Sequence, residues 1–177
     1  VRNYAMVEEA AQETVSKFGS IDVLVACAGG AETRIIQGGA FYELPIEVVD
    51  WGIDVNLKGA LYFDHVAMKQ MVKQKSGVII NLGSMTGVDG AYDALAYSAS
   101  KSALMNGVVK SLALAGAEFG IRACCVAPGP VLTRPSIAEA KSLLGGPIQT
   151  QEIVDMILYL ASDKAASMTG STVLLDR

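Results

Sequence analysis

Apolar residues gather in short runs along this chain, and longer stretches of mixed polarity separate those runs. Short apolar runs are typical of strands that are buried on both faces of a parallel sheet, and amphipathic stretches between them are typical of helices. The pattern predicts strands at residues 21–26, 77–82, 121–127 and 171–175, and helices at residues 4–18, 46–75, 92–118 and 150–161. This alternation predicts an α/β fold with a parallel sheet.

Glycine, proline and threonine mark where the predicted helices begin and end. Gly19 and Gly120 follow two of the helices, and each can adopt the left-handed conformation that ends a helix. Pro45 suits the first turn of the second helix, and Thr150 is placed to cap the last helix. The polarity pattern and the punctuating residues therefore agree on the helix boundaries.

Three segments are predicted to be loops. Residues 31–44 contain Gly38 and Gly39, which favour a loop. Residues 85–90 form a second, glycine-containing loop. Residues 130–147 follow a Pro-Gly break and are expected to form a loop with one short helix. No repeat or domain linker interrupts the chain, so residues 1–177 are interpreted as a single domain.

Composition and charge exclude several classes of protein. Hydrophobic residues make up 51% of the 177 residues, enough for a substantial core. A net charge of −4, with no Lys/Arg cluster, argues against a nucleic-acid partner. No apolar run reaches the ~18 residues of a membrane span, and we expect no signal peptide. The default expectation is a cytoplasmic protein with no membrane partner.

The cysteine and histidine residues do not suggest a disulfide framework or a metal centre. Cys27, Cys124 and Cys125 are an odd number of thiols without a Cys-x-x-Cys pattern, and they lie in or beside apolar runs. We therefore expect reduced, buried thiols. His65 is the only histidine and has no partner at ligand spacing, so no metal site is predicted.

A serine, a tyrosine and a lysine form the strongest candidate for chemistry. Tyr97 and Lys101 stand four residues apart in a predicted helix, so their side chains share one face. An ammonium beside a phenol favours the phenolate, which suits the tyrosine to proton transfer. Ser84 follows a predicted strand, where its hydroxyl could hold a substrate oxygen. The Tyr-x-x-x-Lys spacing alone is a weak signal, because an ordinary helix with an exposed lysine also produces it.

Three features follow the carboxyl ends of predicted strands. They are the Ala28-Gly29 turn, Ser84 and the Pro128-Gly129 break. Open parallel sheets bind ligands at this edge, so we expect the three to lie together around a site. Glycine permits a ligand to approach the backbone closely, although a plain tight turn would explain Gly29 equally well.

Four motifs resemble those of the short-chain dehydrogenase/reductase family. Residues 24–29, Leu-Val-Ala-Cys-Ala-Gly, are similar to that family's Asn-Asn-Ala-Gly turn with both asparagines replaced. Residues 54–59, Asp-Val-Asn-Leu-Lys-Gly, resemble its helix segment with the catalytic asparagine. Residues 128–133, Pro-Gly-Pro-Val-Leu-Thr, resemble its Pro-Gly motif, and residues 169–170 resemble its C-terminal end. The resemblance covers essentially the whole chain.

The resemblance implies a fold and a reaction. The implied fold is a Rossmann-like, doubly wound parallel sheet that is partial, because the family's first strands have no counterpart here. The implied reaction is transfer of a hydride between NAD or NADP and a small-molecule carbonyl or secondary alcohol. The choice between NAD and NADP depends on a segment that this sequence lacks, and the substrate is left open.

The resemblance also implies roles for individual residues. Ser84, Tyr97 and Lys101 stand at the family's spacing. Tyr97 would be the general acid or base, Lys101 would tune it and bind the nicotinamide ribose, and Ser84 would bind the substrate oxygen. Asn56 would hold a water in a proton relay to Lys101, although taken alone an exposed polar position explains Asn56 better. The implied cofactor contacts are Cys27, Ala28, Gly29, Tyr97, Lys101, Pro128, Gly129, Val131 and Thr133.

The sequence also allows two other functions to be considered, a serine hydrolase and an inactive module. A serine hydrolase is disfavoured because residues 83–87 read Gly-Ser-Met-Thr-Gly rather than Gly-x-Ser-x-Gly, and because His65 precedes the serine. A catalytically inactive fragment that acts as a binding or oligomerisation module is the alternative. The family's glycine-rich phosphate turn has no counterpart among the 27 residues before Ala28, which favours that alternative.

Two further expectations concern what surrounds the chain. The helices at residues 46–75 and 92–118 carry more apolar residues than one sheet face should cover, so we expect a homo-oligomer, a dimer or a tetramer. The family's fold places three strands before the strand at residues 21–26. We therefore expect residues 1–177 to be the C-terminal two thirds of the family fold within a longer chain. The strand at residues 21–26 would then lie at an edge of the sheet.

Overall fold

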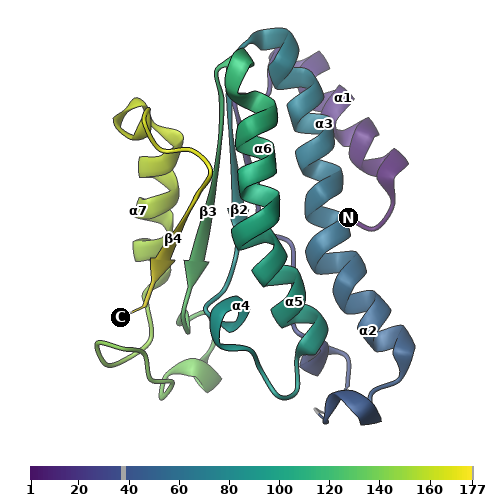
Figure 1. Cartoon of the computed structure of the whole chain (residues 1–177), viewed down its shortest axis with the longest axis vertical. Coiled ribbons are helices and arrows are strands. Elements are labelled where there is room, and N and C mark those ends of the chain that lie inside the picture. Colours follow the sequence, from purple (N-terminus) through teal and green to yellow (C-terminus); the bar gives the residue numbers. More distant parts are fainter. Residues whose placement is uncertain (37–38, 177) are drawn as a thin grey trace.

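A sheet of four parallel strands, in the order β1-β2-β3-β4, forms the centre of the molecule (Figure 1). The structure is a computed structural model that describes residues 1–36 and 39–176, so the predicted loop position Gly38 lies outside the described residues. Residues Val25, Ile80 and Cys124 stand side by side across three strands. The sheet and its helices confirm the α/β, Rossmann-like fold. The strands are β1 Val23–Ala26, β2 Gly77–Leu82, β3 Ile121–Pro128 and β4 Ser171–Leu175.

Helices cover both faces of this sheet, which explains why the strands are apolar along their whole length. Helices α3 and α6 lie over one face and α7 lies over the other (Figure 1), while α1 packs along α3. The helices are α1 Tyr4–Phe18, α2 Ile46–Ile53, α3 Gly59–Gln74, α4 Thr86–Asp89, α5 Leu95–Ala103, α6 Val109–Gly116 and α7 Thr150–Ala161.

The core is divided by the sheet into two clusters, and successive side chains of β2 enter them in turn. Ile79 belongs to the cluster under α3 and α6, together with Met71 and Val109. Ile80 belongs to the cluster under α7, together with Leu160. Each of these side chains is at most 1% exposed. This alternation decides which face of the sheet each side chain enters, and the parallel register brings the ends of β1, β2 and β3 to the same edge.

The two long predicted helices are each interrupted by a single π-helical segment. Residues Asp54–Lys58 separate α2 from α3, and residues Leu104–Val108 separate α5 from α6. The helical conformation continues through both π segments, so the two long predicted helices are present, with a local change of hydrogen-bond pattern that was not predicted. The predicted start at residue 92 was wrong, because α5 begins at Leu95 after a turn.

Three smaller boundary predictions also differ from the structure. The predicted loop at residues 85–90 contains helix α4. Gln149, rather than Thr150, occupies the N-cap position of α7. β1 begins at Val23 rather than at residue 21, because the Gln74 side chain bonds to the backbone N–H and C=O of Ile21 at 2.9 and 3.0 Å.

Strand β1 lies at an edge of the sheet, where the strand at residues 21–26 was expected. Val23 on this strand is 42% exposed. Gly19 and Gly120 have φ angles of +85° and +68°, so both adopt the predicted left-handed conformation. Of the helices in the described residues, none has the length and apolar character needed to cross a membrane.

Candidate active site

Helix α5 brings Tyr97 and Lys101 to the carboxyl edge of the sheet, where the strand arrowheads point in Figure 1. Both side chains line one cavity of about 380 Å³. The same cavity is lined by Gly29 after β1, Leu82 at the end of β2 and Thr133 after β3. Segments that are far apart in the sequence thus meet where an open α/β sheet binds its ligands.

Lys101 is buried against the end of β2. The residue is only 4% exposed. Its Nζ donates a hydrogen bond of 2.6 Å to the carbonyl oxygen of Leu82. The same Nζ lies 5.5 Å from the centre of the Tyr97 ring, within the range of a cation–π contact. Burial lowers the pKa of the Lys101 ammonium, and the nearby thiols of Cys125 and Cys27 act in the opposite direction.

Ser84 lies in a neighbouring cavity rather than in the one that Tyr97 lines. That cavity measures about 310 Å³, and Pro128 lines both. The Ser84 Oγ accepts a hydrogen bond of 3.2 Å from the backbone N–H of Thr86, in the first turn of α4. The structure therefore places Ser84 beside the Tyr97–Lys101 cavity, with Pro128 between the two spaces.

Asn56 holds the turn that follows β1. Its Oδ1 accepts a 2.9 Å hydrogen bond from the N–H of Gly30, and its Nδ2 donates to the carbonyl oxygens of Gly30 and Gly52 at 2.9 and 2.8 Å. Asn56 is 0% exposed, so the interpretation as an exposed polar position was wrong. A Cβ atom at Gly29 would lie 2.6 Å from Asn56 Oδ1 and 3.4 Å from Lys101 Nζ. Gly29 is therefore required for close packing in this turn.

The remaining predicted cofactor contacts fall into three groups. Cys27, Pro128 and Thr133 line the cavity with Tyr97. Gly129 lines the neighbouring cavity with Ser84. Ala28 and Val131 line neither, and Val131 instead pairs with Ile148 in an isolated bridge and packs against the core under α7.

The three cysteines are all free, as predicted, but they are not all buried. Cys124 and Cys125 are buried within β3, whereas Cys27 is exposed. Cys27 lies one residue beyond the end of the edge strand β1. In the described part of the chain, no three His, Cys, Asp or Glu side chains group as they would around a metal ion.

Three charged residues near the cavity were missed by the sequence analysis. Arg34, at the end of a short 3-10 helix after β1, and Arg134, in the loop after β3, line the cavity. Glu32 is 0% exposed and bonds to the backbone of α5. All three lie in segments that were predicted only as loops. A polarity pattern gives no signal for a loop residue whose contacts are far away in the sequence.

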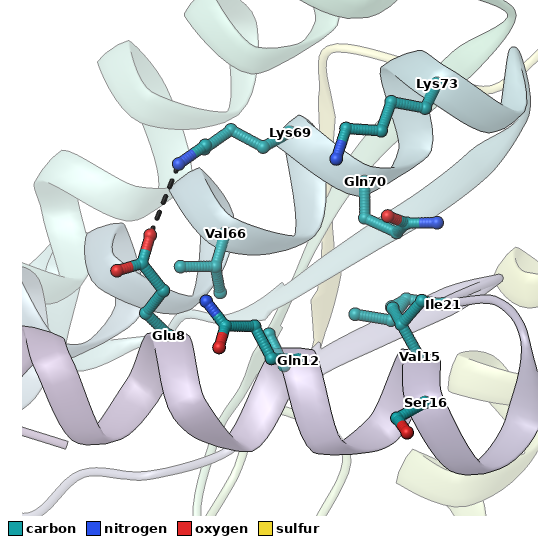
Figure 2. Close-up of a pocket in the computed structure, with 10 residues that line it drawn as sticks. Glu8, Gln12, Val15, Ser16, Ile21, Val66, Lys69, Gln70 and Lys73 are labelled. Atoms are coloured by element: carbon teal, nitrogen blue, oxygen red, sulfur yellow. Dashed lines mark hydrogen bonds and ion pairs between the residues drawn. The ribbon is translucent and has the colours of Figure 1, made fainter.

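A third cavity, of about 360 Å³, lies between α1 and α3 (Figure 2). It is lined by Val15, Ile21 and Lys73, which precede the amino ends of β1 and β2. The dashed line in Figure 2 marks the ion pair of Glu8 with Lys69, at 3.3 Å. The charges of Glu8 and Lys69 in this cavity thus neutralise each other in part. The cavity also lies away from the edge at which open parallel sheets bind ligands.

Comparison with known proteins points to nicotinamide-dependent enzymes. A family model described as enoyl-(acyl carrier protein) reductase matches residues 1–177. L-rhamnose 1-dehydrogenase (NAD(P)(+)) of a Sphingomonas species is 32% identical over 95% of this chain and 70% of its own length. The 3-oxoacyl-[acyl-carrier-protein] reductase of Thermotoga maritima is 32% identical over 96% of this chain and 70% of its own length.

A solved structure agrees with these sequence matches. The crystal structure of acetoin dehydrogenase from Salmonella typhimurium superimposes with a TM-score of 0.84 and 29% sequence identity. The superposition covers 95% of this chain and 68% of that chain. The structural similarity therefore extends over nearly all of this chain.

Proposed function

The chain belongs to the short-chain dehydrogenase/reductase family of NAD(P)-dependent oxidoreductases, and from this premise we propose that it transfers a hydride between a nicotinamide dinucleotide and a carbonyl or secondary alcohol carbon, with Tyr97 as the general acid or base. One observation carries the proposal. Helix α5 presents Tyr97 and Lys101 to the same cavity, next to the Gly29 turn at the carboxyl edge of the sheet.

The cavity suits the nicotinamide half of such a dinucleotide. Its volume of about 380 Å³ is in the range of small-molecule sites. Its donors are the Lys101 ammonium, the Thr133 hydroxyl and the guanidinium groups of Arg34 and Arg134. These groups fit ribose hydroxyls and phosphate oxygens. When bound, the dinucleotide supplies or accepts the hydride.

Tyr97 moves the proton in this proposal. Its hydroxyl donates a proton to the carbonyl oxygen during reduction and accepts it back during oxidation. The Lys101 ammonium near its ring stabilises negative charge on the phenol oxygen. The hydrogen bond from Lys101 to the Leu82 carbonyl holds the ammonium in place, so that it does not turn away to solvent.

Ser84 has a hydrogen atom available for the substrate. Its Oγ acts as acceptor toward the N–H of Thr86, so its own proton can be donated to a substrate oxygen. A hydrogen-bond donor aimed at an oxygen that gains negative charge lowers the activation free energy by about 3–4 kcal/mol in comparable sites. For this role the substrate oxygen must lie at the junction of the two cavities, beside Pro128.

The side chain of Asn56 is committed to the backbone, which limits its part in a proton relay. Both amide hydrogens are donated, to Gly30 and Gly52, and one lone pair of Oδ1 accepts from Gly30. Only the second lone pair of Oδ1 is left to hold a water that leads to Lys101. We therefore assign Asn56 first to holding the Gly29–Gly30 turn, and second to the relay.

The exposed faces of α3 and α6 support assembly with a second copy. An apolar groove of about 650 Å³ between them is lined by Leu61, Met68 and Leu112. Leu61 and Leu114 are 38% and 80% exposed. Three other apolar residues of the two long predicted helices, Val66, Met71 and Leu104, are instead buried in the core. We propose a homo-oligomer, dimer or tetramer, in which the groove is covered symmetrically.

The relatives suggest which substrates to test. They are named for a sugar, an acyl thioester and acetoin, which share only a carbonyl or alcohol carbon. The proposed test follows the absorbance of the reduced nicotinamide with L-rhamnose, acetoacetyl-CoA and acetoin, each with both dinucleotides. Turnover of one of them supports the proposal. Dinucleotide binding without any turnover would favour the alternative of an inactive binding module.

A further inference from the structure

Glu32 is a buried acid whose partners lie on the helix that carries Tyr97. The residue is 0% exposed, and none of the ion pairs among the described residues includes it. Its Oε1 accepts a hydrogen bond of 2.6 Å from the backbone N–H of Ala96. Its two oxygens also accept from the N–H of Tyr97, at 3.3 and 3.4 Å. A buried acid requires such donors, because burial without hydrogen bonds is costly.

The helix needs this acceptor because its own sequence provides none. α5 begins at Leu95, so Ala96 and Tyr97 are its second and third residues, whose N–H groups have no partner within the helix. Ala94 occupies the N-cap position and has no side chain that can accept a hydrogen bond. Glu32, 64 residues earlier in the chain, supplies the cap instead, and its negative charge is favourable at the positive end of the helix.

The space around this contact is closely packed. A Cβ atom at Gly52, in α2, would lie 2.8 Å from the Cβ of Ala96 and 3.5 Å from the Cγ and Cδ of Glu32. Helices α2 and α5 therefore meet at Glu32 with no room for an additional methyl group. The side chain has little freedom to move, so its oxygens set the position of the first turn of α5.

The same short segment also holds the turn beside Lys101. Gly30, two residues before Glu32, is bonded through both its N–H and its C=O to Asn56. The segment from Gly30 to Glu32 is thus fixed at one end to the π-helical segment and at the other end to α5. The Gly29 turn and Tyr97 form two sides of the cavity, and the same short segment, residues 30–32, contacts both.

We propose that Glu32 is a positioning residue for Tyr97: it fixes the backbone of the tyrosine relative to the Gly29 turn and so sets where the phenol hydroxyl meets the substrate. The proposal rests on the proposed function for its catalytic consequence. Its structural part, the capping of α5 by Glu32, does not depend on that function. A displacement near 1 Å of a reacting group can cost about a hundredfold in rate, so this contact is expected to affect kcat.

The test compares Glu32→Met with Glu32→Gln in the full-length protein. The two side chains are close in length, but only glutamine keeps an oxygen that can accept from Ala96. We expect Glu32→Met to lower kcat by about a hundredfold while the KM for the dinucleotide stays within about threefold. We expect Glu32→Gln to restore kcat to within about fivefold of wild type, because it loses the charge but not the acceptor. The matched controls are Glu152→Met and Glu152→Gln, since Glu152 accepts from the N–H of Gln149 at the start of α7, outside the cavity.

The two Glu152 controls should leave kcat unchanged. Equal loss of kcat in Glu32→Met and Glu32→Gln would overturn the proposal, as would unchanged kcat in both. Amide hydrogen exchange supplies a readout that needs no activity. In wild type, the amide of Ala96 should exchange about tenfold or more slowly than that of Gln151, the second residue of α7. Comparable exchange of the two amides overturns the proposal even if Glu32→Met fails to fold. Absence of turnover in wild type, with Ala96 protected, would count against the proposed function and not against the cap.

Discussion

The buried pair of Asp64 and Asn81 predicts that stability depends on pH in an unusual direction. Asp64, on α3, is 1% exposed, and Asn81, on β2, is 0% exposed. The Nδ2 of Asn81 donates a 3.0 Å hydrogen bond to Oδ2 of Asp64. The two other side-chain oxygens, Oδ1 of each residue, have no hydrogen-bond partner among the described residues. A proton on Asp64 can satisfy both, because the carboxylic acid can then donate to the amide oxygen.

The magnitude follows from the shift in pKa. Burial raises the pKa of Asp64 from 3.8 to about 7, and the hydrogen bond from Asn81 opposes the rise. The folded state therefore holds the proton more tightly than the unfolded state does. Its contribution to stability is fully present below pH 3.8 and is lost as the pH rises to about 7. At about 1.4 kcal/mol for each pH unit, the difference of roughly three units corresponds to about 4 kcal/mol.

The test is to measure the free energy of unfolding in urea for wild type and Asp64→Asn between pH 4 and pH 8. The substituted amide keeps a donor and cannot ionise, so the variant should be more stable than wild type by about 2–4 kcal/mol at pH 8, and by little or nothing at pH 4. Asp155→Asn, at an exposed position on α7, removes the same charge and should change stability by less than about 0.5 kcal/mol at each pH. Parallel unfolding profiles for wild type and Asp64→Asn across this range would refute the reasoning.

Two further predictions concern assembly and the cofactor turn. Leu114→Arg places a charge on a side chain that is 80% exposed on α6, and it should reduce the mass measured by light scattering. Leu144→Arg, equally exposed but on the loop before α7, should not, and an unchanged mass for both would contradict the proposed interface. Gly29→Ala brings a Cβ to 2.6 Å from Asn56 Oδ1, so the turn must shift, and the Kd for the dinucleotide measured by calorimetry should rise about tenfold. An unchanged Kd would show that this turn does not contact the dinucleotide.

The strands could be predicted from the sequence because their signal is local. Residues 77–82 and 171–175 have the predicted bounds, since both are short apolar runs that end at recognisable breaks. The position of β1 at the edge was also predicted, from the strand order of the family rather than from the residues. Asparagine is mildly unfavourable inside a helix unless its side chain has a partner, which is a local signal at Asn56, and the residue is buried.

The features that were missed depend on contacts between distant residues. The side chain of Glu32 acts on Ala96 and Tyr97, and nothing near Glu32 in the sequence indicates such a partner. The two π-helical segments are a local change in backbone hydrogen bonding, from i→i+4 to i→i+5, which the predicted helix bounds do not reveal. Cys27 resembles a buried thiol in sequence because it follows an apolar run, yet its exposure depends on what covers the edge strand.

The role of Tyr97 in proton transfer is tested most directly by Tyr97→Phe in the full-length protein, measured with the best substrate and dinucleotide pair. Tyr159→Phe is the matched control, because it also removes one hydroxyl, which donates to the carbonyl of Lys164 on the far side of the sheet. The account predicts that Tyr97→Phe lowers kcat by about a hundred- to ten-thousandfold and leaves the Kd for the dinucleotide within about threefold, while Tyr159→Phe changes neither. A Tyr97→Phe protein with a kcat close to that of wild type would contradict it.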